Sequence, residues 1–525
     1  MLPTVSTPLF LRASLLVLCS ALSILHSTAN NIQATNGALS GDNGTQLFVQ
    51  FDLSWENSWL FGSDQRDAAW VFVKFRGTDG LWRHCSLDNS GHVAPSGSTI
   101  TPGLVAPASA FNASTNPAVG AFIYRNADGN GTFTANAVQL RWNYSVDNIA
   151  AIDVQEVRVF AIEMVLVPQG AFAAGSGGAE TNAFTLTTIN TANATMAPSG
   201  TGSLGGQAGG FPTGQFTPST ASWPNGFNAF YCMKYEVTQQ GYVDFLNTLT
   251  RTQQNTRTGT DISGTAITNR YVMSNSAGLS FRNGIRCDAT LPSSPAPVTF
   301  YCDLNGNGAG GEASDGKDIA CNYLSWGDLS AYLDWSGLRP MTELEFEKAC
   351  RGTIAPVANE YPWGTNGLAG SAYTLANAGA TNEGIAANYS TTLGNASLNA
   401  TDGAINGPLR VGIFAAAGSN GGRVTAGASY YGIMELGGNL LERAVNIDFT
   451  ESLEYTGVHG NGGLAAGGSG DATTWPATSA LGTGFRGGAF NTNATDLQVS
   501  DRLDAASNNS FRINTTSGRG VRMAP

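Results

Sequence analysis

The chain has 525 residues, of which 42% are hydrophobic and 12% charged, a length that predicts about two or three globular domains. Its net charge of −12 provides no basic face for nucleic acid and disfavours binding to anionic lipid headgroups. The 66 glycines, together with many Asn, Ser and Thr residues, indicate a chain rich in turns and poor in helix.

The first 29 residues have the pattern of a secretory signal peptide. In "LRASLLVLCSALSILHSTANN", Arg12 precedes an apolar run from 13 to 25, and small residues lead up to Ala29. The run is short for a membrane span, and no later run approaches about 18 apolar residues. We therefore expect a mature protein that is secreted or placed at the cell surface, without a transmembrane segment; an uncleaved N-terminal anchor is the alternative.

Export permits disulfide bonds, so the cysteines of the mature chain are candidates for pairing. One cysteine, Cys85, lies in the N-terminal part, and five lie between 232 and 350. Cys302 and Cys321 bracket a loop rich in Gly and Asp and are the expected pair, although spacing alone does not fix connectivity.

Residues 30–160 alternate between apolar and polar side chains, as half-buried strands do. Examples are "AWVFVKF", "VGAFIYR" and "VQLRWNYSV", which are separated by clusters of Gly, Asn, Asp and Pro. The pattern predicts an antiparallel β-sandwich domain. Because no pairing of catalytic residue types occurs in it, an adhesive or spacer role is expected.

A strand over 154–172 leads directly into the second part of the chain, and the Gly-, Ser- and Thr-rich stretch 175–217 is expected to be surface loop. Three short helices are predicted after it. They are "TQQGYVDFLNTL" capped by Thr238, "SWGDLSAYLDWSG" capped by Ser325 and ended by Gly337, and "TELEFEKACRG" capped by Thr342 and ended by Gly352.

Six motifs occur in an order typical of one family. They are "YEVTQQGYVDFL", "LSWGDLSAYLDWSGLRPMTELEFEKACRG", "YPWG", "YYGIMELGGNLLERAV", "FRGGAF" and "GRGVRM". Residues 161–525 thereby resemble the formylglycine-generating enzyme family, the sulfatase-modifying factor domain. The resemblance implies an α+β, C-type-lectin-like fold with few short helices and long loops, here following the β-sandwich.

The resemblance also implies two structural calcium sites. The first would use Asn388, the Tyr389 carbonyl, Asp402 and the Ala404 carbonyl; the second would use Glu435, the Gly438 and Leu440 carbonyls, and Glu442. Ca²⁺ takes six to eight oxygen ligands, carbonyls included, and stabilises loops that no helix supports. Solvated loop residues without a metal are the alternative.

A separate loop, "CDLNGNGAGGEASDG", begins like an EF-hand calcium loop. Asp303, Asn305 and Asn307 stand at alternate positions before Gly308, but Ser314 stands where the twelfth position needs Glu. A loop of Asx-turns accounts for the same residues.

The family's oxidases hold copper with two thiolates just after the RGG-aromatic strand. Arg486, Gly487, Gly488 and Phe490 match that strand, but Thr492 and Leu497 stand at the thiolate positions. Because Cu(I) prefers sulfur ligands, copper is not expected. The family's iron-dependent branch uses histidines, and residues 161–525 contain only His459.

The leading hypothesis is a non-catalytic protein that binds a protein, peptide or glycan outside the cytoplasm or serves as a surface scaffold. The candidate binding residues are Asn491, Asn493, Asp496, Asp501, Arg502, Asn508 and Asn509, in a segment dense in side chains suited to adaptable hydrogen bonding. Loop capping by the same residues is the alternative.

Two other functions stay open. One is a formylglycine-generating-type oxidoreductase that acts on a cysteine of a protein substrate and uses cysteines from elsewhere in the chain, such as Cys321 or Cys350. The other is a structural component of an export or surface-motility machine.

Overall fold

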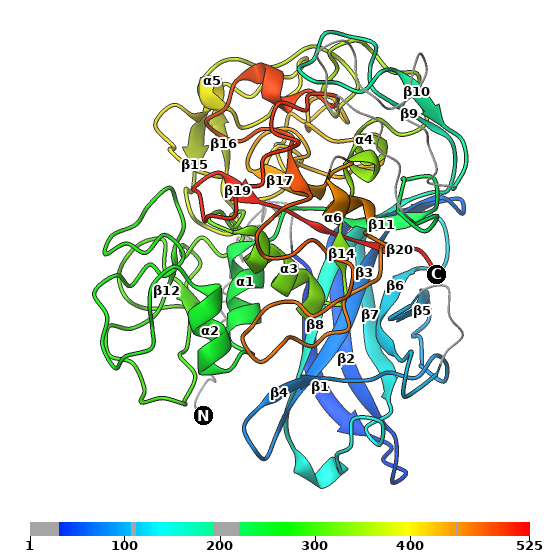
Figure 1. Ribbon diagram of the computed structural model, residues 1–525, viewed down its shortest axis with the longest axis vertical. Helices are drawn as coiled ribbons and strands as arrows, with labels where there is room; N and C mark the ends of the chain where they lie inside the picture. Colours follow the sequence, from blue (N-terminus) through cyan, green and yellow to red (C-terminus); the bar gives the residue numbers. More distant parts are fainter. Residues whose placement is uncertain (1–30, 107–111, 193–219, 448) are drawn as a thin grey trace, which may run out of the picture.

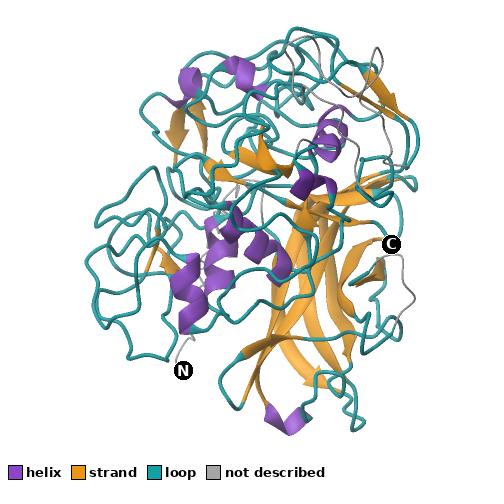
Figure 2. Cartoon of the chain, viewed as in Figure 1, coloured by secondary structure: helices purple, strands orange, loops and turns teal. Residues whose placement is uncertain are grey.

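The computed structural model describes residues 31–106, 112–192, 220–447 and 449–525. The predicted signal peptide and part of the predicted loop 175–217 lie outside these ranges. Long loops connect strands and a few short helices (Figure 2), an arrangement consistent with the predicted α+β class. No helix of the described residues is long and apolar enough to cross a membrane.

The N-terminal part consists of eight antiparallel strands. They are β1 Gln33–Ser40, β2 Leu47–Phe61, β3 Gln65–Gly77, β4 Trp82–His84, β5 Ser98–Leu104, β6 Ala118–Arg125, β7 Gly129–Trp142 and β8 Val154–Val167. Strands β1 and β7 flank β2, whereas β6 and β8 flank β3. The β2–β3 hairpin joins the two groups of strands.

These groups pack as two layers because β2 and β3 alternate along their length. Every second residue of β2, from Leu47 to Trp55, is buried in the same core as Ala69, Val71 and Val73 of β3. In the sequence this alternation appears in "LFVQFDLSW", residues 47–55 of β2.

The sheet does not end with the N-terminal part. Beyond β8 it continues through β11 Phe230–Met233, β20 Gly520–Met523 and β14 Arg339–Pro340, giving 11 strands in all (Figure 1). The boundary expected near residue 160 lies inside β8, which pairs with β3 on one side and β11 on the other. The two parts of the chain therefore share one sheet.

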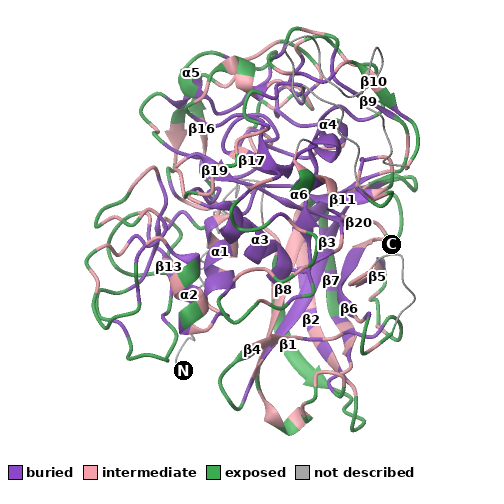
Figure 3. Cartoon of the chain, in the orientation of Figure 1, coloured by how far each residue is buried: buried purple, intermediate pink, exposed green. Residues whose placement is uncertain are grey.

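The second face of β3 is also buried. Trp70 and Phe72 point away from the N-terminal core and join Phe245, Tyr332 and Trp335 in the largest core of the molecule. Figure 3 shows β3, α1 and α3 as buried. A central strand covered on both faces has few polar positions, which explains the continuous apolar run in "AAWVFVKF".

All three predicted helices are confirmed, with the predicted caps. They are α1 Gln239–Leu246, α3 Trp326–Trp335 and α4 Glu343–Arg351, with N-caps Thr238, Ser325 and Thr342. A fourth, α2 Arg251–Arg257, begins at a capping box formed by Thr250 and Gln253. Two single-turn helices, α5 Asn399–Asp402 and α6 Thr450–Leu453, lie in the later loops.

The C-terminal end of α3 meets the shared sheet. Its last carbonyl groups accept hydrogen bonds from Lys74 Nζ (to Trp335, 2.7 Å) and Trp70 Nε1 (to Ser336, 2.8 Å), both on β3. Arg522 of β20 donates to the next carbonyl, that of Gly337. Side chains of the N-terminal part thus satisfy backbone acceptors of the C-terminal part.

Short strands organise the remaining loops. They form the pairs β9 Phe172–Ala174 with β10 Thr187–Ile189, β12 Ile285–Arg286 with β13 Tyr301–Cys302, and β15 Thr374–Ala376 with β16 Gly384–Ala387. In a separate sheet, β17 Leu441–Val445 lies between β18 Thr483–Arg486 and β19 Thr516–Ser517. This sheet carries the motifs "LLERAV" and "FRGGAF".

Candidate functional site

The turn after β18 requires glycine. Gly487 and Gly488 have φ angles of 85° and 70°, in the region that favours glycine. A Cβ on Gly487 would lie 2.6 Å from the carbonyl oxygen of Leu436, and the Gly487 carbonyl accepts a hydrogen bond from Gly438 N at 2.7 Å. The turn therefore holds the segment 435–442 against the end of β18.

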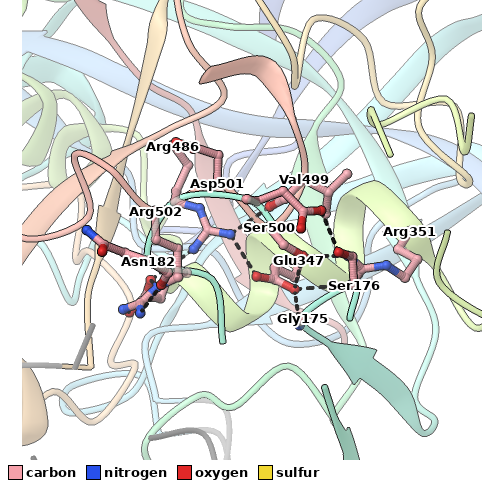
Figure 4. A network of polar contacts seen from close by, with 12 residues as sticks. Gly175, Ser176, Asn182, Glu347, Arg351, Arg486, Val499, Ser500, Asp501 and Arg502 are labelled. Atoms are coloured by element: carbon pink, nitrogen blue, oxygen red, sulfur yellow. Dashed lines mark hydrogen bonds and ion pairs between the residues drawn. The ribbon is translucent and has the colours of Figure 1, made fainter. Parts of the chain in front are cut away.

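Arg486 connects this turn to α4. Its guanidinium is buried and donates to Glu343 Oε2 at 2.9 Å and to Glu347 Oε1 at 2.8 Å. Arg351 donates to the other oxygen of Glu347 at 3.1 Å (Figure 4). Burial opposes the charge on Glu347, but Arg351 and Arg486 together lower its pKa. The two carboxylates, one turn apart on α4, fix the position of "FRGG".

Neither of the two residues at the family's copper-thiolate positions, Thr492 and Leu497, is a suitable ligand for copper. The Thr492 hydroxyl accepts a hydrogen bond from Ala489 N at 2.9 Å and so closes the turn on itself. Leu497 is fully buried and packs with Tyr361 and Trp363. A hydroxyl held in a turn and an aliphatic core residue do not fit a soft metal ion.

The first predicted calcium site comprises Asn388, Tyr389, Asp402 and Ala404. Asn388 Nδ2 donates to the carbonyl of Ala372 at 2.6 Å, and a Cβ on Gly403 would lie 2.9 Å from the Ala372 side chain. Both predicted segments therefore contact Ala372 and lie close together. Burial raises the pKa of Asp402, whose carboxylate accepts hydrogen bonds from the backbone N–H groups of Asn406 and Gly407 in its own loop.

The second predicted site comprises Glu435, Gly438, Leu440 and Glu442. Glu435 and Glu442 are both buried, and in each the Oε2 atom has no hydrogen-bond partner within the described part of the chain. Burial raises the pKa of Glu435 to about 7. Arg519 donates to Glu442 Oε1 at 2.6 Å.

A third buried carboxylate, Glu236, faces this second site. It accepts hydrogen bonds from Leu440 N at 2.9 Å and from the Asn439 amide, and burial followed by repulsion from Glu442 raises its pKa. Arg519 acts on all three buried carboxylates, and Arg410 acts on Glu435 as well. The two unpartnered oxygens could serve as ligands of a divalent cation that has backbone carbonyls as co-ligands.

Side-chain ligands alone do not form a metal centre: within the described ranges, no three His, Cys, Asp or Glu side chains are grouped to hold a metal ion. Either calcium site would therefore depend on backbone carbonyls, as the expected ligand sets do.

The family described as the sulfatase-modifying factor enzyme 1-like domain matches residues 150–518. The chain belongs to this family. The match begins close to β8, the strand that the N-terminal and C-terminal parts share.

Two curated relatives of this family match shorter segments. The formylglycine-generating enzyme of Thermomonospora curvata is 33% identical over 81 residues, which are 15% of this chain and 25% of the relative. The inactive Cα-formylglycine-generating enzyme 2 of Mus musculus is 36% identical over 70 residues, 13% of this chain and 21% of the relative. The matched segments thus span a quarter or less of either relative.

The cysteines of this family member correct one prediction. All six in the described residues are free and buried, so Cys302 and Cys321 do not form the predicted disulfide. Both lie in the large core beneath α1 and α3, where the Cys321 thiol is directed to the carbonyl of Asn322. Burial raises the pKa of every one of the six thiols, to about 12 for Cys232 and Cys287.

The predicted ligand-binding residues divide into two groups. Asn491, Asn493 and Asn508 are exposed, and Asp496 and Asn509 are partly exposed. Arg502 is fully buried and Asp501 is 6% exposed. Burial raises the pKa of Asp501 to about 6. The exposed and partly exposed residues are accessible to a partner, whereas Arg502 lies in the polar network of α4 (Figure 4).

The EF-hand-like loop is closed by its own side chains. Asp303 pairs with Arg286, and Asn305 Nδ2 donates to Glu312 Oε2 and Ser314 Oγ, both at 2.9 Å. Asn305 and Asn307 accept hydrogen bonds from backbone N–H groups two residues ahead. These contacts are those of the Asx-turn alternative.

His459, the histidine considered for iron, has a structural role. It is 2% exposed, and its Nε2 accepts a hydrogen bond from Met523 N at 3.0 Å. Burial lowers its pKa far below the usual range. It helps to hold the C-terminal strand β20 in the shared sheet.

Proposed function

We propose that this protein is a secreted or cell-surface member of the formylglycine-generating enzyme family that binds a macromolecular ligand and does not oxidise cysteine. One observation carries the proposal: a turn-forming threonine and a core leucine, Thr492 and Leu497, stand at the positions of the copper thiolates. The existence of a relative named as inactive is in keeping with it.

The state of the other cysteines supports the same conclusion. A thiol must be a thiolate to bind copper or to attack, and burial opposes ionisation; at Cys350 burial outweighs the attraction of Arg351 and Arg486. Cys321 and Cys350, the candidates for an alternative site, are both fully buried, and burial raises both pKa values well above the usual range. An oxidoreductase would need them exposed and adjacent.

The proposed ligand-binding surface is the exposed part of the segment 491–511. It combines Asn491, Asn493 and Asn508 with two exposed apolar side chains, Leu503 (53% exposed) and Phe511 (75% exposed). Amide side chains around a few apolar anchors suit a protein, peptide or glycan partner. The lectin-like fold implied by the resemblance would present such loops on a rigid scaffold.

Structural calcium forms part of this proposal. At the second site Glu435 and Glu442 would hold the ion, with the Gly438 and Leu440 carbonyls as co-ligands. Bound there, Ca²⁺ would neutralise buried carboxylates and stabilise the loop that supports the turn at Gly487. The unpartnered Oε2 atoms of both glutamates favour this assignment.

Metal analysis, thiol titration and a peptide oxidation assay on one preparation test the proposal. We expect calcium, no stoichiometric copper, no formylglycine on a cysteine peptide after incubation with Cu(I), and six thiols that react only after denaturation. Stoichiometric copper together with peptide oxidation would instead establish the oxidoreductase. Retention of an extracellular component on the immobilised protein, lost in Phe511→Ala, would identify the binding surface.

A further inference from the structure

A cleft of about 830 Å³ lies where the β2–β3 hairpin meets the loop 415–434. The two walls come from opposite ends of the chain: Trp59 and Arg66 from the N-terminal part, Arg423 and Tyr430 from the C-terminal part. Volumes of about 300–1,000 Å³ are typical of sites that take up a small organic ligand.

The walls of this cleft are cationic, although the protein is strongly acidic. The lining contains Arg66, Lys234 and Arg423 but no Asp or Glu, in a chain with net charge −12. Lys234 is neutralised from behind by Glu163 at 3.0 Å. Among the described residues, neither Arg66 nor Arg423 has a carboxylate within ion-pair distance, although Glu360 attracts Arg423 from farther away. The two guanidinium groups leave the cleft positively charged.

Arg423 and its neighbour Tyr431 also carry unused hydrogen-bonding atoms. Arg423 Nε and the Tyr431 hydroxyl are buried, and neither has a hydrogen-bond partner among the residues that the structure describes. Arg423 is held in place by the carbonyl of Pro362, which accepts from its terminal nitrogen at 2.8 Å. A preorganised guanidinium with a free N–H is suited to a carboxylate or sulfate group.

Aromatic rings also line the cleft. Trp59 and Tyr431 pack against the same core, and Tyr430 stands edge-on to Tyr431 with ring centroids 4.9 Å apart. Phe61 and Tyr430 remain 49% and 38% exposed. Flat, exposed rings can stack against the apolar faces of sugar rings, burying area on both sides.

The polar groups and the strand pairing distinguish between ligand classes. Asn57, Gln65 and Asn130 line the cleft, and each amide offers both donors and acceptors, as the hydroxyl groups of a sugar require. A peptide that binds by adding a strand to the sheet would need a free strand edge. At the hairpin end of the cleft, Leu60 of β2 is paired with β7 on one side and with β3 on the other, which disfavours strand addition there.

We infer that this cleft is a binding site for a short acidic oligosaccharide, whose sugar rings stack on the aromatic walls and whose carboxylate or sulfate group binds Arg423 and Arg66. The site is separate from the segment 491–511. If the cleft binds no acidic oligosaccharide, the proposed function of that segment is not affected.

The test uses the full mature chain and an array of uronate-, sialate- and sulfate-bearing oligosaccharides, each beside its neutral counterpart. Isothermal titration with trigalacturonate and the other acidic trisaccharides then gives affinities. We expect saturable binding of at least one acidic oligosaccharide, weakened by about tenfold or more in Tyr430→Ala and in Arg423→Gln. Monosaccharide acids should bind more weakly than trisaccharides if ring stacking contributes.

Two comparisons keep the inference falsifiable. Ile152→Ala, which removes an exposed side chain outside both the cleft and the segment 491–511, should bind the acidic probe like the wild type, and Phe61→Ala serves as a second cleft variant with an exposed side chain. Retention of no acidic oligosaccharide, equal binding of the neutral counterparts, or loss of binding in Ile152→Ala alone would overturn it. Binding of peptides in place of glycans, abolished by Tyr430→Ala, would also overturn it.

Discussion

Arg502 and Glu343 form a two-point ion pair in the interior of the protein. Arg502 Nε donates to Glu343 Oε2 at 2.7 Å, and a terminal nitrogen donates to Oε1 at 2.8 Å. The guanidinium also lies 3.8 Å from the ring centroid of Phe184. Arg502 thus connects the C-terminal loop to α4, and its charge is directed inward.

Replacing Arg502 is therefore expected to destabilise the protein. Arg502→Met should lower the free energy of unfolding by about 3–5 kcal/mol, because Glu343 then keeps a buried charge with one partner fewer. Chemical denaturation measures the effect. Arg83→Met, at an exposed ion pair, should cost about 1 kcal/mol or less. A stable Arg502→Met protein that has lost ligand binding would show instead that Arg502 contacts the ligand.

Leu497 should behave as a core residue. Leu497→Ala removes a fully buried side chain from a cluster with Tyr361 and Trp363, which predicts a loss of about 2–5 kcal/mol in unfolding free energy. Leu503→Ala, at a side chain that is 53% exposed, should change stability by about 0.5 kcal/mol or less. Equal effects of the two substitutions in denaturant titrations would contradict the packing described.

Lys74 should make stability depend on pH in the alkaline range. Burial lowers its pKa to about 7 in the folded protein, against 10.5 ordinarily. Between these values the unfolded chain binds the proton and the folded chain does not, so the free energy of unfolding should rise with pH, by about 2 kcal/mol or more. Below pH 7 Lys74 is protonated in both the folded and the unfolded state, so it adds no further pH dependence to the free energy of unfolding.

Comparison of two lysine variants isolates this effect. The rise between about pH 7 and pH 10 should be absent in Lys74→Met and retained in Lys317→Met, where the lysine is exposed. Denaturant titrations at a series of pH values measure it. Parallel profiles of Lys74→Met and the wild type would show that Lys74 keeps an ordinary pKa.

Removal of calcium should lower thermal stability if the ion is structural. We expect EDTA to lower the melting temperature by several degrees and added Ca²⁺ to restore it. Asp402→Asn should reduce the response to EDTA, while Asp79→Asn, in an exposed ion pair, should leave it unchanged. A melting curve that EDTA does not alter would refute both calcium sites.

Local signals predicted the helices well. Thr342 with Glu345 and Ser325 with Asp328 are capping boxes in the sequence and in the structure. The same signal, Thr250 with Gln253, marks α2, but without an apolar stripe it is easily overlooked. Capping depends on residues three apart, so the sequence displays it directly.

Long-range contacts were not predictable in this way. The cleft joins Trp59 to Tyr431, and the pairing of Arg502 with Glu343 spans 159 residues. A polar segment such as 491–518 gives no sign of which charged side chain points inward, so Arg502 was interpreted as a ligand contact. The predicted disulfide between Cys302 and Cys321 is wrong for a similar reason: the spacing of two cysteines in the sequence does not determine whether they form a bond.

The contacts at the end of α3 make the two parts of the chain interdependent for folding. Lys74 and Trp70 lie on a strand far upstream of the family domain, yet they occupy carbonyl groups that would otherwise be buried without a donor. A fragment beginning at residue 150 should therefore be insoluble or molten when expressed alone, which far-UV and near-UV circular dichroism would show. Recombination that exchanged the family domain between proteins would have to carry β3 with it, so this architecture is expected to be inherited as one indivisible unit.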